Sequence, residues 1–111
     1  MPLQIEIVSD HKDIVGDDCV RVFREDGGTI GRSLESDWIL PDPDRFISGK
    51  HATIDFQSGA FYLADVSTNG VFVNDEEEPL GKGNPRRLFH GDRLRMGDFE
   101  FEVTLDEGEG L

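Results

Sequence analysis

The chain has 111 residues, 36% of them hydrophobic, and it carries a formal net charge of −13 at pH 7. This length suits one domain with a two-layer core, and the acidic balance argues against broad binding to nucleic acids or anionic membranes, which requires basic surfaces. The single cysteine excludes an internal disulfide, and no stretch has the composition of a signal peptide or a membrane span, so we expect a cytoplasmic protein.

Short apolar runs separated by turn residues predict an all-β chain. The expected strands lie at residues 3–7, 19–24, 29–32, 38–40, 52–56, 61–63, 71–73, 93–96 and 99–103. No window shows a sustained helical stripe. Many short strands at this spacing predict a two-sheet antiparallel β-sandwich over residues 1–105, and residues 106–111 are expected to begin an acidic, glycine-containing linker.

Two of the connections between expected strands have recognisable sequence patterns. Gly97-Asp98 has the pattern of a two-residue hairpin turn with glycine in the first position. Residues 74–85 contain three consecutive glutamates and are expected to form a long solvated loop. We expect Arg86 and Arg87 to lie in the same glycine-rich, solvated loop, with a contact to a partner as the alternative.

The stretch from residue 48 to residue 70 organises the rest of the chain. Its two expected strands, joined by a turn at residues 57–59, form an antiparallel hairpin, so the residues before the first strand and after the second lie at the same end. Adjacent strands are only about 4.8 Å apart, which places the loops at residues 48–51 and 67–70 side by side. These loops gather hydroxyls, amides and a cation, and that combination suits an anion.

Several separated motifs resemble one known family. They are Gly31-Arg32, Ser48-x-x-His51, Asp65-x-Ser67-Thr68-Asn69-Gly70, Asn74, Gly91-Asp92 and Met96-Gly97. In this order they resemble the forkhead-associated (FHA) domain over residues 20 to 103. The resemblance implies a two-sheet β-sandwich whose loops at one end bind phosphothreonine in a partner peptide. Residues 38–51 further resemble the N-terminal FHA domain of type VI secretion scaffold proteins.

The resemblance also implies a function. The chain is expected to be an adaptor module rather than an enzyme, with no cofactor and no metal. Its expected partner is a phosphothreonine-containing protein or peptide, such as a threonine kinase or a secretion component, and neither nucleic acid binding nor membrane insertion is expected. Recruitment of that partner would contribute to the post-translational control of type VI secretion.

The chemistry of a phosphate supports a specific set of residues. Phosphothreonine carries a charge of about −1.5 to −2 and three strong acceptor oxygens. Arg32 offers a planar fork for bidentate contact, and the two loops add hydroxyls and a nest of backbone N–H groups. The amide of Asn69 suits a contact with the peptide backbone. The predicted phosphopeptide-binding residues are Arg32, Ser48, Gly49, Lys50, Thr68 and Asn69.

Other residues of the motifs are expected to brace the loops. By resemblance to the family, His51 holds the binding loops in place rather than contacting the ligand. Asp65 shares the parity of the inward-facing residues on its strand, so its carboxylate is expected to point inward and accept loop N–H groups. Gly31 and Gly70 are expected to be turn glycines with positive φ, and Asn74 a local turn brace.

Some of these residues have a simpler interpretation. Arg32 could form only a surface ion pair, and Lys50 could be merely solvated. Gly49 occupies a position where FHA domains often place a basic or amide side chain. The missing side chain leaves open a phosphate-independent protein scaffold on the same fold.

A Ser/His hydrolase is a more remote alternative. Ser48, His51 and Asp65 are the residue types of a nucleophile, a base and an orienting acid. No nucleophile-elbow pattern surrounds the serine, however, and a bracing histidine would not be free to act as a base. The histidines at positions 11, 51 and 90 and Cys19 match no metal-ligand spacing.

Overall fold

The computed structural model describes residues 3–9, 19–41 and 46–105, and within these ranges the chain forms ten strands and no helix. The strands are β1 (Leu3–Ile7), β2 (Val20–Phe23), β3 (Gly28–Gly31), β4 (Trp38–Ile39), β5 (Ala52–Gln57), β6 (Ala60–Asp65), β7 (Val71–Val73), β8 (Arg86–Arg87), β9 (Arg93–Met96) and β10 (Phe99–Leu105). Residues 10–18, between the first two expected strands, and the expected linker at 106–111 lie outside the described residues. Within these described ranges, no helix is long and apolar enough to cross a membrane.

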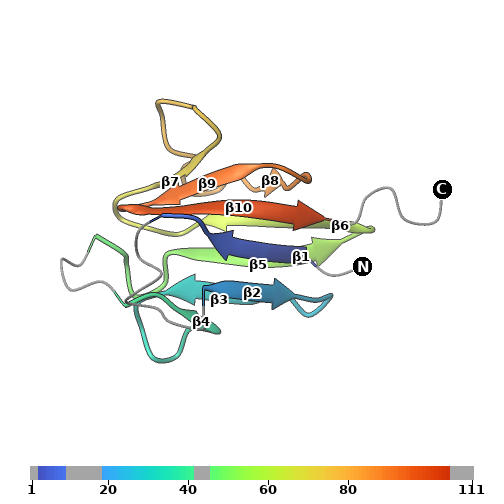
Figure 1. Ribbon diagram of the computed structural model, residues 1–111, viewed down its shortest axis with the longest axis horizontal. Coiled ribbons are helices and arrows are strands. Elements are labelled where there is room, and N and C mark those ends of the chain that lie inside the picture. The colour runs from blue at the N-terminus through green and yellow to red at the C-terminus, as the bar shows by residue number, and fades with distance from the viewer. Residues whose placement is uncertain (1–2, 10–18, 42–45, 106–111) are drawn as a thin grey trace.

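The strands form two five-stranded sheets, which Figure 1 shows as two layers. One sheet has the order β2-β1-β10-β9-β7 and the other the order β4-β3-β5-β6-β8. All neighbouring strands are antiparallel except β3 and β4, which run parallel. The predicted two-sheet β-sandwich is therefore confirmed, with one short parallel pair at the edge of the second sheet.

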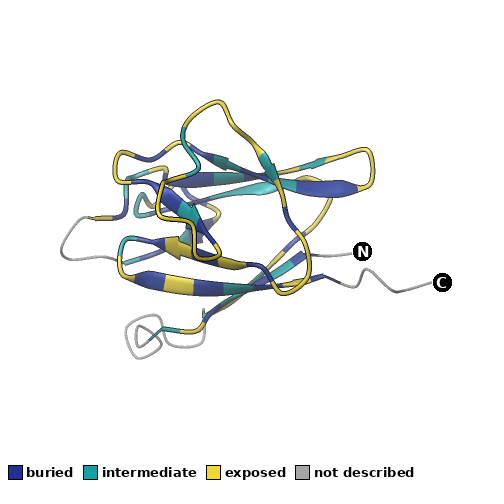
Figure 2. Ribbon diagram, turned by 90° about the horizontal axis from the view of Figure 1, so that it is seen from above, coloured by how far each residue is buried: buried dark blue, intermediate teal, exposed yellow. Residues whose placement is uncertain are grey.

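The core lies between the sheets because apolar residues alternate along the longest strands. In β10, Phe99, Phe101 and Val103 are buried while the two glutamates between them face outward, as Figure 2 illustrates by the alternating burial along the strands. Trp38 is fully buried and meets the Phe101 ring edge-on at 5.6 Å between centroids. The period of two thus sets which face of each strand joins the core.

One expectation about the loops is wrong. Arg86 and Arg87, expected to lie in a solvated loop, form the edge strand β8 and pair with Leu63 and Tyr62 of β6, although Arg87 is exposed as expected. Arg86 is half-buried and its guanidinium forms a salt bridge of 2.7 Å with Glu76, inside the predicted loop. Backbone pairing with β6, rather than any apolar alternation, makes this segment a strand.

The sheet register explains why distant segments meet at one end of the sandwich. Ile30 pairs with Ala52, and Ala52 pairs with Asp65, so these three residues form one row across β3, β5 and β6. The chain leaves β3 and β6 and enters β5 just beyond this row. Figure 1 shows the resulting loops at the opposite end from the β5–β6 turn.

Candidate functional site

Three loops meet at this end of the sandwich through direct hydrogen bonds. The Arg32 backbone N–H donates to the Ser48 carbonyl at 3.0 Å, and Arg32 Nε donates to the Ile47 carbonyl at 3.1 Å. The Thr68 backbone N–H donates to Ser48 Oγ at 3.0 Å. We call Arg32, Ser48 and Thr68 the loop cluster. The structure therefore brings together three predicted binding residues that come from three separate loops.

The guanidinium of Arg32 lies against the loop that carries Ser48. The side chain is half-buried, and Ile47 O is its hydrogen-bond acceptor. Among the residues that the structure describes, no carboxylate forms a salt bridge with Arg32. Its charge is therefore not neutralised by an ion pair within that part of the chain.

Two consecutive backbone N–H groups next to Ser48 are available to a ligand. The N–H groups of Gly49 and Lys50 donate to no acceptor within the described ranges, whereas the Ser48 N–H is bound to His51. Gly49 is partly exposed and Lys50 is exposed. Adjacent free N–H groups of this kind form a small nest for anions.

The carboxamide of Asn69 is partly used within the protein. Its Nδ2 donates to the Phe46 carbonyl at 2.9 Å, so Asn69 ties its own loop to the β4–β5 loop. The side-chain carbonyl oxygen has no hydrogen-bond donor among the residues described. Asn69 therefore keeps an acceptor for a peptide N–H while its position is fixed.

His51 is fully buried and joins two of the loops. Its Nδ1 accepts a hydrogen bond from the Ser48 N–H at 3.0 Å, so the ring proton lies on Nε2, which donates to the Gly70 carbonyl at 2.9 Å. Neither ring nitrogen is directed at Ser48 Oγ, which instead accepts from the Thr68 N–H. The nucleophile–base contact that a Ser/His hydrolase requires is therefore not formed.

Asp65 anchors the β6–β7 loop from the inside. The alternation along β6 buries its carboxylate, as the sequence parity predicts. Oδ1 accepts from the Ser67 N–H and the Ser67 hydroxyl, and Oδ2 accepts from the N–H groups of Val71 and Gly81 at 3.0 and 3.1 Å. Burial by itself raises the pKa of Asp65, but these hydrogen bonds outweigh it, and the pKa is lowered below its ordinary value of 3.8.

The two glycines expected to have positive φ differ. Gly70 has a φ of +101° and is a turn glycine as expected. Gly31 does not have positive φ, so that expectation is wrong. A Cβ at Gly31 would lie 2.1 Å from the Gly49 carbonyl oxygen, which shows that glycine is needed for the close approach of two loops.

Asn74 braces a different part of the chain from the loop cluster. It adopts a φ of +55°, its Oδ1 accepts from the Arg93 N–H at 3.0 Å, and it follows β7, whereas Gly70 precedes that strand. Asn74 therefore holds the β7–β9 pair and the loop that leaves it.

The structure gives bracing roles to three serines for which the sequence predicted none. Ser67 Oγ accepts from the Gly70 N–H at 2.7 Å, which closes the β6–β7 turn. The Ser33 N–H and the Ser36 hydroxyl both donate to the Gly49 carbonyl, at 3.0 and 3.1 Å. The Asp-x-Ser-x-x-Gly spacing is a turn signal for Ser67, but nothing local in the sequence indicates the two contacts to Gly49.

The chain belongs to the FHA domain family, whose pattern matches residues 28–97. The probable serine/threonine-protein kinase fhkA of Dictyostelium discoideum is 32% identical over 108 residues, a match that covers 89% of this chain and 18% of the kinase. Protein FraH of a Nostoc species is 36% identical over 78 residues, covering 63% of this chain and 26% of FraH. The chain thus spans about a quarter or less of these curated relatives.

Solved structures of FHA domains have the same fold. One, from a study of phosphothreonine-dependent FHA domain interactions, is 26% identical with a TM-score of 0.73, and the match covers 95% of this chain and 97% of that one. The FHA domain of FhaA, solved in complex with the intracellular domain of another protein, is 28% identical with a TM-score of 0.65, covering 91% and 98%.

Proposed function

We propose that this FHA domain binds peptides that contain phosphothreonine, with the phosphate held at the loop cluster. The nest of free N–H groups at Gly49 and Lys50, directly beside Ser48, is the observation that carries the proposal. Family membership and the similar domain studied for phosphothreonine-dependent interactions support it.

The donors of the loop cluster match the chemistry of a phosphate dianion. Arg32 supplies a permanent positive charge and free terminal N–H groups, and the hydroxyls of Ser48 and Thr68 supply neutral donors. Charge-assisted hydrogen bonds contribute roughly 1.5–3 kcal/mol each, so three or four of them support micromolar affinity, about −8 kcal/mol. Because the loops are already held together, little ordering is required when the peptide binds.

A titration with paired peptides tests the proposal. We expect a phosphothreonine peptide selected from a library to bind at least about tenfold more tightly than its unphosphorylated form, because the phosphate contributes charge-assisted bonds. The affinity should weaken below about pH 6, where the phosphate dianion gains a proton and loses one of its two negative charges. Equal affinity of the two peptides in calorimetry would contradict the proposal.

Thr68→Val identifies the site within the same experiment. Valine removes the hydroxyl but keeps the side-chain shape and the backbone N–H that donates to Ser48. We expect about a tenfold loss of affinity for the phosphorylated peptide and little change in melting temperature. Thr104→Val, at an exposed position on β10, is the matched control and should bind like the wild type.

A phosphate-independent scaffold is the second candidate. It is favoured by the missing side chain at Gly49 and by two exposed apolar residues beside the loop cluster, Leu34 (86% exposed) and Phe46 (49%). In that case the unphosphorylated peptide would bind as tightly, and Leu34→Ser would weaken both forms alike.

A role in type VI secretion is the finer part of the proposal. It rests on the resemblance of residues 38–51, four of which lie outside the described residues. The curated relatives reported above, a kinase and FraH, do not carry that role in their names. A pull-down from the native cell with wild type and Thr68→Val would test it, and we expect a phosphorylated secretion component or threonine kinase only with the wild type.

A further inference from the structure

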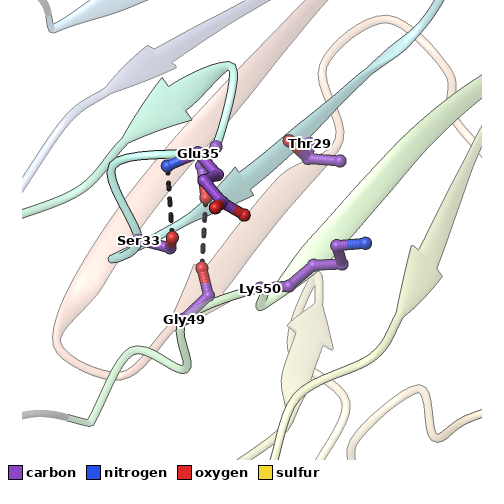
Figure 3. Close-up of a pocket in the computed structure, with 6 residues that line it drawn as sticks. Thr29, Ser33, Glu35, Gly49 and Lys50 are labelled. Carbon is purple, nitrogen blue, oxygen red and sulfur yellow. Dashed lines mark hydrogen bonds between the residues drawn. The ribbon is translucent and has the colours of Figure 1, made fainter.

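A pocket of about 250 Å³, whose lining includes two charged residues, lies beside the loop cluster, between the β3–β4 loop and the residues that precede β5. Its walls are Thr29, Ser33, Glu35, Ser36, Gly49 and Lys50, and Figure 3 shows five of them labelled around the opening. Ser33 follows Arg32 in the chain, and Gly49 follows Ser48. The pocket therefore begins one residue away from two members of the loop cluster.

Hydrogen bonds within the protein hold the walls of the pocket in place. The Gly49 carbonyl accepts two hydrogen bonds from the β3–β4 loop, from the Ser33 N–H at 3.0 Å and the Ser36 hydroxyl at 3.1 Å. The Glu35 N–H donates to Ser33 Oγ at 3.1 Å, which fixes the turn that carries the Glu35 side chain. The dashed lines in Figure 3 mark two of these contacts. Preformed walls of this kind discriminate between ligands better than mobile ones do.

The two charged side chains of the pocket have opposite signs and do not pair. Glu35 and Lys50 form no salt bridge with each other, and neither charged group has a hydrogen-bond partner within the described ranges. Figure 3 shows the ammonium of Lys50 and the carboxylate of Glu35 apart, with no contact between them. The nearby Asp37 carboxylate is already bound by the N–H and hydroxyl of Thr29. One free acceptor and one free donor therefore line the same pocket.

This arrangement disfavours ligands that carry a single charge. A lysine or arginine of a bound peptide would be attracted by Glu35 but repelled by Lys50. A glutamate or aspartate would be attracted by Lys50 but repelled by Glu35. An apolar side chain would form a hydrogen bond with neither group. A carboxamide has an N–H₂ donor for the Glu35 carboxylate and a carbonyl acceptor for the Lys50 ammonium. It therefore offers a partner to both groups and introduces no like charge.

We infer that this pocket selects glutamine or asparagine at a position flanking the phosphothreonine, an inference that rests on the proposed function. An extended peptide advances about 3.3 Å per residue, so a side chain within a few residues of the phosphothreonine reaches a wall that begins at Ser33 and Gly49. Glu35 and Lys50 are then specificity-determining residues. The phosphate itself stays with the loop cluster.

A phosphopeptide panel tests the inference. One phosphothreonine peptide is prepared with Gln, Glu, Lys or Leu at each position from four before to four after the phosphothreonine, and affinities are measured by fluorescence anisotropy. At one of these positions we expect glutamine to bind about fivefold more tightly than the other three residues, as one additional hydrogen bond contributes ~1 kcal/mol.

Two variants should then change the preference in opposite directions. Glu35→Gln should restore the binding of the glutamate peptide, and Lys50→Gln should restore that of the lysine peptide, each by about fivefold. Lys82→Gln, at an exposed position outside the pocket, is the control and should leave the order unchanged. Equal affinities across the panel, with phosphorylated peptides still preferred, would overturn this inference alone. Loss of the preference for phosphorylated peptides would overturn the proposed function together with it.

Discussion

At the scale of single residues, the site depends on buried polar side chains that the ligand would not contact. Asp65 accepts four hydrogen bonds from the β6–β7 loop and the residues after it, and His51 connects Ser48 to Gly70. A buried carboxylate that lost these donors would be costly, and the donors would be left unpaired without the carboxylate. The geometry around Thr68 is therefore set by residues inside the sandwich.

The lowered pKa of Asp65 gives a stability that depends on pH. Since the folded-state pKa lies below the ordinary value of 3.8, the stabilisation is complete above about that pH and is lost as the pH falls through the folded-state pKa. Asp65→Asn, which cannot accept all four bonds, should lower the free energy of unfolding by about 3 kcal/mol at pH 7. The difference from the wild type should shrink below pH 4.

Urea unfolding at several pH values measures this difference. Asp55→Asn, at an exposed position on β5, is the matched control and should behave like the wild type throughout. A destabilisation by Asp65→Asn that stayed the same from pH 7 to pH 3 would show that the ionised carboxylate is not what holds the loop.

At the scale of elements, Gly31 at the end of β3 and Gly49 in the β4–β5 loop should respond very differently to the same change. A methyl group at Gly31 would lie 2.1 Å from the Gly49 carbonyl oxygen, whereas one at Gly49 would meet only the Ser33 Cβ, at 3.8 Å. Gly31→Ala should therefore destabilise the fold by roughly 2 kcal/mol, because the β3–β4 and β4–β5 loops must separate. Gly49→Ala should leave stability unchanged or raise it by about 0.5 kcal/mol.

Thermal unfolding of the two variants is the measurement. If Gly31→Ala melted at the temperature of Gly49→Ala, the close contact between the loops would not exist in solution. Gly49→Ala also keeps the backbone N–H that is proposed to contact phosphate, so its effect on stability can be measured without removing that donor.

Much of this architecture could be predicted from local pattern. The strands with clear alternation, such as β1, β5 and β10, were found within two residues of their bounds, because a period of two and a turn signal are both local properties. β8 could not be found, because two consecutive arginines have no alternation and become a strand only by pairing with β6. The need for glycine at position 31 was likewise hidden, since the oxygen that excludes a side chain belongs to a residue 18 positions later.

At the scale of the whole molecule, the sandwich separates the site from the ends of the described chain. Leu3 pairs with Leu105, and both lie at the opposite end of the strands from the loop cluster. The net charge of −13 repels acidic peptides at long range, so the local charge of Arg32 and the free N–H groups must provide the attraction at short range. Physiological salt screens charges over about 8 Å, so the distant carboxylates act weakly at the site and the nearby donors dominate there.

Chemical-shift mapping tests the central claim most directly. An isotope-labelled domain is titrated with a phosphothreonine peptide and with its unphosphorylated form, and the backbone amide signals are followed. We expect the largest phosphate-dependent shifts at Gly49 and Lys50, with smaller ones at Arg32 and Thr68 and none at Ser58 and Gly59 in the β5–β6 turn. Saturable shifts confined to that turn or to β8, with the loop-cluster amides unmoved, would contradict the account.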